Sequence, residues 1–190
     1  KKHVDILAMN EEEGLAITGF EDPLLAADKA LDWTDLVICT AGEKGLFMAG
    51  YVDEQFKRET EYPLLPGAIA DFNRYEFSRA MRKDDCQNPI RAYSHTAPFM
   101  GGPDSIKNTN GAGDCALAAV LHDLSANVYH KLNVANSAKH QQPAMTYSSL
   151  AQISKYANRA SYEVLVQHSP RLSRGLPERE DCLEQVYWDQ

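Results

Sequence analysis

The sequence has 190 residues, of which 44% are hydrophobic and 24% charged, a composition typical of a soluble globular domain with a sizeable core. Its 27 acidic residues outnumber 19 basic residues and give a formal net charge of −8, so we expect no binding to nucleic acid. We see no apolar run of about 18 residues and no charged-then-apolar leader, so we predict neither a membrane span nor secretion and expect a cytoplasmic protein.

Short apolar runs alternate with helical segments in the first part of the sequence. Residues 4–8 are predicted to be a buried strand, followed by a helix over residues 10–19. A second helix is predicted over residues 22–33, with a proline at its first position. Residues 36–40 are predicted to form a second buried strand, and residues 46–52 a strand that returns beside it.

The pattern is less regular between residues 53 and 107, where we predict one helix over residues 68–81 and no strand. An apolar, alanine-rich helix is predicted over residues 115–124. Apolar residues at three- and four-residue spacings predict a long amphipathic helix over residues 147–167. Residues 168–190 are rich in proline and charge and are predicted to form a surface tail without regular structure.

The alternation of strands and helices predicts an α/β fold, in which a mostly parallel sheet carries helices on both faces. Only two or three strands are predicted, fewer than such a sheet normally needs, and the sequence begins directly on a strand. We therefore expect residues 1–190 to be one portion of a longer protein.

The cysteine and histidine spacings favour no zinc site. Cys39, Cys86, Cys115 and Cys182 do not pair at metal-ligand distances along the sequence, and the six histidines are scattered. Reduced, buried thiols are the expected state of cysteines in apolar stretches.

The most specific motif is NTNGAGD, residues 108–114, which leads directly into the apolar helix. The first amides of a helix have no intrahelical acceptor, and the helix dipole favours negative charge there. Glycine lets the backbone turn tightly and lets a ligand approach its amides. The motif therefore predicts an anion-binding loop at Gly111, Ala112 and Gly113, with the carboxylate of Asp114 beside it.

Two other interpretations of this loop follow from the residues alone. Asp114 can be only a helix cap and the glycines only a loop, and this alternative stays open. The segment also fits the loose dinucleotide pattern G-x-G-x-x-A, but no strand precedes it and none follows at the required distance, so we reject that interpretation. A G-x-x-x-x-G-K-[ST] phosphate loop is absent from the sequence.

NTNGAGD followed by a helix of small residues resembles the D-T-x-G-A-G-D signature of the ribokinase-like (PfkB) kinases. The resemblance implies that Asp114 is the general base and that the amides of Gly111, Ala112 and Gly113 form an anion hole. Asn108 stands where most members have Asp, which removes a charge at the edge of the phosphate site. The implied fold is a three-layer α/β/α sandwich with a mostly parallel sheet, of which this sequence holds the C-terminal portion.

A second resemblance lies at the start of the first predicted helix. Asn10 and Glu13 resemble the family's N-x-x-E motif, which implies a role in holding magnesium and phosphate, largely through water. The same spacing is also a helix-capping pattern, and one residue can serve both roles.

The remaining resemblances concern the nucleotide. Thr40, Gly42 and Gly45 resemble the family's T-x-G-x-x-G turn, although a plain hairpin turn is the alternative interpretation. The other residues assigned to nucleotide binding are Thr109 and Asn110 of the NTNGAGD motif and Asn158, in the region that borders adenine.

Segments 7–13, 30–42, 64–82, 108–114 and 168–181 resemble the bacterial branch of the family that phosphorylates inosine and guanosine, and residues 53–107 are taken as an insertion specific to that branch. The implied activity is transfer of phosphate from ATP to the 5′-hydroxyl of a purine nucleoside in purine salvage. ATP and Mg²⁺ are the implied cofactors, K⁺ is a further candidate, and a homo-oligomer is compatible with the family. The alternatives are a sugar kinase of the same family and an inactive nucleotide-binding fragment. We expect little activity from the isolated 190 residues, because the resemblance leaves the ribose-binding strands and lid outside them.

Overall fold

The structure, a computed structural model, describes residues 4–59, 75–98, 103–129 and 149–177. Within these ranges four strands form one sheet, in the order β1 (Ile6–Asn10), β2 (Leu36–Thr40), β3 (Leu46–Asp53) and β4 (Pro89–Thr96). β1 is parallel to β2, whereas β3 is antiparallel to its neighbours β2 and β4. β1, β2 and β4 therefore run in the same direction, and their carboxyl ends lie at one edge of the sheet.

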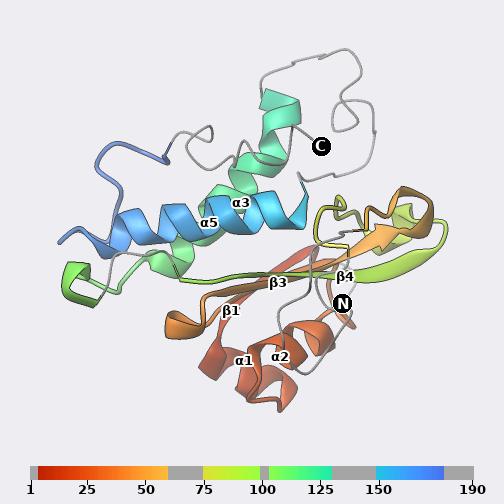
Figure 1. Ribbon diagram of the computed structural model, residues 1–190, viewed down its shortest axis with the longest axis horizontal. Coiled ribbons are helices and arrows are strands. Elements are labelled where there is room, and N and C mark those ends of the chain that lie inside the picture. The colour runs from red at the N-terminus through yellow and green to blue at the C-terminus, as the bar shows by residue number, and fades with distance from the viewer. Residues whose placement is uncertain (1–3, 60–74, 99–102, 130–148, 178–190) are drawn as a thin grey trace.

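Helices cover both faces of this sheet (Figure 1). α1 (Glu11–Thr18) and α2 (Pro23–Ala30) lie on one face, and α3 (Ala112–Tyr129) and α5 (Leu150–Leu165) lie on the other. The predicted three-layer α/β/α arrangement is thus confirmed for the described residues. None of the helices in these ranges is long and apolar enough to cross a membrane. Short 3₁₀ helices lie at Gly42–Lys44, Glu54–Phe56, Lys83–Asp85 and Pro103–Ser105.

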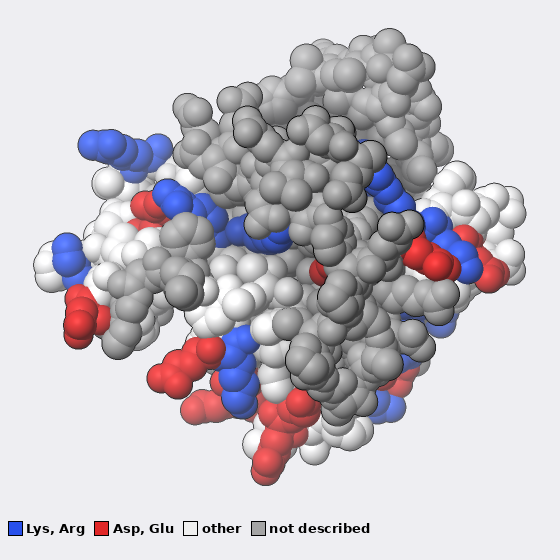
Figure 2. Space-filling view, viewed as in Figure 1, with Lys and Arg blue, Asp and Glu red and all other residues white. Residues whose placement is uncertain are grey.

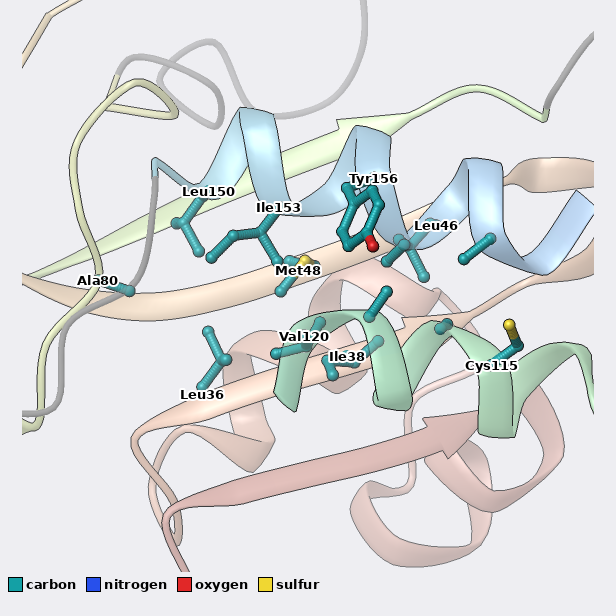
Figure 3. Packing of buried hydrophobic residues seen from close by; sticks show 14 of the residues in the cluster. Leu36, Ile38, Leu46, Met48, Ala80, Cys115, Val120, Leu150, Ile153 and Tyr156 are labelled. Atoms are coloured by element: carbon teal, nitrogen blue, oxygen red, sulfur yellow. The ribbon is translucent and has the colours of Figure 1, made fainter. Parts of the chain in front are cut away.

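The buried residues form two clusters, because successive side chains of a strand point to opposite faces of the sheet. The cluster against α3 and α5 takes every second residue of β2 and β3: Leu36, Ile38, Leu46 and Met48 (Figure 3). The cluster against α2 takes the residues between them: Val37, Cys39, Ala49 and Tyr51. Thr40 continues the first set, so its side chain lies on the α3–α5 side at the end of β2.

β4 is the main element that the sequence did not predict. It pairs along its whole length with β3, from Leu46 opposite Thr96 to Asp53 opposite Pro89. The segment therefore contributes a strand to the sheet, although it belongs to the range 53–107 that was taken as an insertion. Its polar side chains hide the pattern: the buried hydroxyl of Ser94 lies 2.9 Å from that of Ser154 in α5.

The helix predicted over residues 68–81 lies partly outside the described residues, and its described part, residues 75–81, is not helical. These residues form a turn and two isolated bridges, which pair Tyr51 with Met81 and Arg79 with Ser149. The amide of Met81 donates to the carbonyl of Tyr51 at 2.8 Å. Backbone hydrogen bonds to distant segments thus replace the local ones of a helix.

The predicted surface tail, residues 168–190, is described as far as residue 177. This part has neither helix nor strand, and most of its residues are exposed. Leu172 and Leu176 are nevertheless partly buried against the α3–α5 cluster. The hydroxyl of Tyr156 donates to the carbonyl of Pro177 at 3.1 Å, so the segment is fixed along α5.

Candidate functional site

The sequence motifs meet at the edge of the sheet where β1, β2 and β4 end. Asn10 and Thr40, the last residues of β1 and β2, are register partners. A Cβ added at Gly113 would lie 3.9 Å from the hydroxyl oxygen of Thr40. The start of α3 therefore lies beside the end of β2, and the structure brings together the N-x-x-E, T-x-G-x-x-G and GAGD segments.

The start of α3 has the geometry of an anion-binding loop. Gly111 has a φ of +83°, and a Cβ there would lie 2.4 Å from the carbonyl oxygen of Pro170, so only glycine fits. The first helical hydrogen bond runs from the amide of Cys115 to the carbonyl of Gly111 at 2.9 Å. The amides of Ala112, Gly113 and Asp114 precede it and have no acceptor within the helix.

Asp114 is exposed at this helix start, in the first turn of α3. The adjacent Cys115 is buried, and burial, with a smaller contribution from the charge of Asp114, raises the pKa of its thiol to about 11. Cys115 is therefore a buried core residue whose environment disfavours the thiolate. Asp114 is the exposed acidic side chain of this first turn, and its role as a base stays a prediction.

The residues before the glycines form a tight turn. The amide of Asn110 donates to the side-chain oxygen of Asn108 at 3.0 Å, and the side-chain amide of Asn108 donates to the carbonyl of His168 at 3.2 Å. Thr109 and Asn110 are exposed. Both directly precede the predicted anion-binding loop, and their assignment to nucleotide binding stays a prediction. Asn108 makes the hydrogen bonds that hold the turn.

The start of α1 is capped by its own side chains. The side-chain oxygen of Asn10 accepts a hydrogen bond from the amide of Glu13, and a carboxylate oxygen of Glu13 accepts one from the amide of Asn10, each at 2.8 Å. The capping interpretation of N-x-x-E is thereby confirmed. Both side chains remain exposed, so they can also meet a ligand. Figure 2 shows acidic side chains over the α1–α2 layer, to which this helix start belongs.

The turn after β2 is fixed against the end of β4. Gly45 has a φ of +94°, and a Cβ there would lie 2.1 Å from the carbonyl oxygen of Thr96. Gly42 has a φ of +47° with open space around it. The amide of Ala41 donates to the carbonyl of Gly45 at 2.8 Å and closes the turn. Both glycines of the T-x-G-x-x-G motif are thus required by backbone conformation.

Contacts that sequence reasoning missed connect this turn to its surroundings. Lys44 pairs with Glu11 at the start of α1, with 2.5 Å between Nζ and Oε1, and this hydrogen bond raises the pKa of the Lys44 ammonium. The carbonyl oxygen of Lys44 lies 2.7 Å from Nε2 of His95, and the ring of His95 stacks on Phe47. Residues so far apart in the sequence carry no local pattern that predicts these contacts.

Asn158 lies beside the end of β4, at the same edge of the sheet. Its side-chain amide donates to the carbonyl of Ala97, directly after β4, at 2.9 Å. Asn158 therefore ties α5 to the end of β4, and its role beside adenine stays a prediction. Among the described residues, no three histidine, cysteine or acidic side chains gather in a way that could hold a metal ion.

Comparisons with known proteins show what this chain is similar to. No protein-family model matches the chain. The chain is 70% identical over 189 residues to the guanosine-inosine kinase of Escherichia coli strain K12 and equally to that of strain CFT073. The match covers 100% of the chain and the C-terminal 44% of these relatives, so the chain spans less than half of their length.

Solved structures support the fold independently. An adenosine kinase from Sinorhizobium meliloti matches with a TM-score of 0.50 at 20% identity, covering 90% of this chain and 33% of that one. A ribokinase from Giardia lamblia matches with a TM-score of 0.50 at 17% identity, covering 94% of this chain and 42% of that one. At these identities the likeness concerns the fold alone.

Proposed function

We propose a function that starts from the family: by sequence and by fold, the chain belongs with the ribokinase-like (PfkB) kinases. In this proposal the full-length protein transfers a phosphoryl group from ATP to the 5′-hydroxyl of a purine nucleoside, inosine or guanosine. The 70% identity to guanosine-inosine kinases supports this substrate class over the sugars of other family members.

One observation carries the proposal: three helix amides without intrahelical acceptors lie beside a single exposed carboxylate, at the edge of the sheet where the other motifs end. The amides of Ala112, Gly113 and Asp114 offer hydrogen-bond donors at the positive end of the α3 dipole. Gly113 carries no side chain, and a Cβ added there would lie 3.9 Å from the hydroxyl oxygen of Thr40, the last residue of β2. A phosphoryl group can therefore approach these amides closely.

Asp114 is proposed as the general base. A hydroxyl is a poor nucleophile at neutral pH, and a carboxylate within hydrogen-bonding reach accepts its proton as the new bond forms, which contributes about 10²–10⁴-fold to the rate. The transferred phosphoryl group carries its charge on three oxygens through a loose transition state. Donors fixed in the backbone of Gly111–Asp114 are already oriented toward that charge, so they stabilise it without rearrangement.

Asn10 and Glu13 are proposed to hold Mg²⁺, which prefers oxygen ligands and is usually bound through a few carboxylates, waters and substrate phosphates. The fit is partial, because the capping hydrogen bonds already use Oδ1 of Asn10 and one carboxylate oxygen of Glu13. The pair therefore fits contact through bound water better than a closed set of protein ligands. When bound, the ion would neutralise phosphate charge. Thr40, Gly42, Gly45, Thr109, Asn110 and Asn158 are proposed to line the nucleotide.

The substitution Asp114→Asn tests the proposal in the full-length protein. It keeps the size of the side chain and removes the proton acceptor, so we expect kcat to fall by about 10²–10⁴-fold while ATP binding persists. Asp104→Asn, the same change at another exposed aspartate, is the matched control and is expected to keep wild-type turnover. Near-normal turnover of Asp114→Asn would remove this residue from the mechanism.

The substrate class is tested separately with a panel of acceptors. We expect inosine and guanosine to be phosphorylated with far higher kcat/KM than ribose, fructose or hexose phosphates. A preference for a sugar would replace the nucleoside assignment with the sister activity of the family and leave the role of Asp114 intact.

A further inference from the structure

Asn108 departs from the family signature D-T-x-G-A-G-D, which has Asp at this position. Both the oxygen and the nitrogen of its side-chain amide form hydrogen bonds. Its Oδ1 accepts a hydrogen bond from the amide of Asn110 at 3.0 Å, and its Nδ2 donates one to the carbonyl of His168 at 3.2 Å. The first partner is only a donor and the second only an acceptor, so together they fix the orientation of the side chain. The side chain is half-buried rather than free in solvent.

A carboxylate at this position could not make both contacts. Aspartate has the same shape and would keep the acceptor for the amide of Asn110, but an ionised carboxylate has no proton to donate. Its second oxygen would face the carbonyl oxygen of His168, and two acceptors at hydrogen-bonding distance repel. The loss of charge at position 108 is therefore matched by the gain of a donor that this structure uses.

The same partner segment holds the rest of the loop. We define the strap as residues 165–170, which are the last residue of α5 and the segment after it. The amides of Lys107 and Asn108 both donate to the carbonyl of Leu165, at 2.8 and 3.3 Å. The carbonyl of Pro170 lies against Gly111, where a Cβ would lie 2.4 Å from it. The strap thus contacts the loop from Lys107 to Gly111, directly before the free amides of α3.

We infer that the strap sets the position of the anion hole, and that Asn108 is a positioning residue whose amide donor is required for this. The inference rests on the proposed function for its catalytic consequence, but its structural part stands on the hydrogen bonds alone. It predicts that the change to aspartate, which restores the usual family residue, damages this protein.

Two substitutions in the full-length protein separate the donor from the charge. Asn108→Asp and Asn108→Ser both keep an acceptor for the amide of Asn110, but both lose the donor that reaches the carbonyl of His168. The carboxylate has no proton to donate, and the serine hydroxyl is one bond shorter than the asparagine amide. Only the change to aspartate adds a charge. The loss of one hydrogen bond that holds the loop in position corresponds to about a tenfold change in rate. We expect kcat to fall about tenfold in both variants, with KM for ATP changing less, because misplaced amides fail mainly in the transition state.

His168→Ala is the control, because it removes the exposed imidazole and leaves the carbonyl that accepts the hydrogen bond. We expect it to keep kcat within about twofold, as expected of surface substitutions. Wild-type kcat in Asn108→Asp would overturn the inference. A loss in Asn108→Asp with wild-type kcat in Asn108→Ser would overturn it too, because charge alone would then explain the effect.

Amide hydrogen exchange keeps the inference separate from the proposed function. We expect faster exchange of the amides of residues 107–110 in Asn108→Ser than in the wild-type protein, with α2 unchanged as an internal reference. If the full-length protein phosphorylates no acceptor, the proposed function fails. The exchange measurement still shows whether the contact between Asn108 and the strap holds the loop. Unchanged exchange at residues 107–110 would show that Asn108 does not hold the loop.

Discussion

Two helices start at the same edge of the sheet, and their starts are built in opposite ways. α1 begins with a closed capping box, in which Asn10 and Glu13 satisfy each other's amides, and its first turn carries three glutamates. α3 begins with glycine and alanine, which have no capping side chains, and carries one acidic residue, Asp114, in its first turn. The capping box uses the amides of Asn10 and Glu13 within the protein, whereas the amides of Ala112, Gly113 and Asp114 are proposed to meet a ligand.

This difference decides which charge each helix start can receive. The glutamates at the start of α1, of which Glu11 is paired with Lys44, disfavour an anion in spite of the helix dipole, and they favour a hydrated cation. The start of α3 combines the same dipole with free amides and close backbone approach, and it favours an anion. A phosphate with its magnesium ion carries both charges. The start of α1 follows the end of β1, and the start of α3 lies beside the end of β2, the strand that pairs with β1.

The largest expected effect comes from Gly111→Ala, which changes the glycine directly before α3. Alanine costs about 1–2 kcal/mol in the left-handed conformation, and its collision with Pro170 adds a packing cost of similar or larger size. We expect the free energy of unfolding of the full-length protein to fall by about 3 kcal/mol or more, as measured by urea denaturation. Turnover should fall with it, because the amides of the loop shift.

Gly19→Ala is the matched control at the other helix, where Gly19 ends α1 with a φ of +81° and nothing within 4 Å of an added Cβ. It carries the conformational cost without a collision, so we expect a loss of about 1–2 kcal/mol and unchanged kinetics. Equal losses at the two glycines would mean that the contact between Gly111 and the strap is of no consequence.

A middle-sized effect is expected from Glu13→Gln, which separates the two roles of the α1 start. Glutamine serves at this position of a capping box, so the free energy of unfolding should change by less than about 1 kcal/mol. The Mg²⁺ concentration for half-maximal activity should rise about tenfold or more, because a negative ligand or its water contact is lost. Glu12→Gln, its neighbour in the same turn, controls for charge alone. A magnesium requirement that changes equally in both variants would restrict Asn10 and Glu13 to capping.

The smallest effect is expected from Lys44→Met, which breaks the ion pair that joins the nucleotide turn to the α1 start. Lys44 is exposed, and exposed pairs contribute little to stability, so we expect no resolvable shift of Tm. KM for ATP should rise a few-fold and the difference should shrink at high salt, because the turn loses its connection to α1. Lys29→Met, which breaks the exposed pair with Asp32 on α2, is the control. Identical KM values in the two variants would contradict a positioning role for Lys44.

The elements that the sequence predicted well are those with strong local signals. The apolar run Leu36–Thr40 is β2 with unchanged bounds, and Pro23 begins α2 with Asp22 as its cap. The helix of small residues after NTNGAGD is α3. In each case the backbone conformation is favoured by neighbouring residues, so distant contacts were not needed to predict it.

The misses share the opposite cause. β4 contains arginine, serine and histidine, and it is a strand because β3 supplies its hydrogen-bonding partner and α5 covers its serine. Residues 75–81 do not form the predicted helix, because their backbone groups form hydrogen bonds with β3 and with the start of α5 instead. Local propensity is a weak preference that such pairings override.

The sequence by itself determined the chemistry of the candidate site, because each motif brings its own conformation: glycines that allow positive φ, a capping pair, and a carboxylate in the first turn of a helix. Only the tertiary structure decided how the motifs combine. The parallel pairing of β1 with β2 places Asn10 beside Thr40, and the strap places its carbonyls against Asn108 and Gly111. These contacts join residues far apart in the chain, so their geometry depends on the packing of the whole sheet and its helices and leaves no local pattern in the sequence.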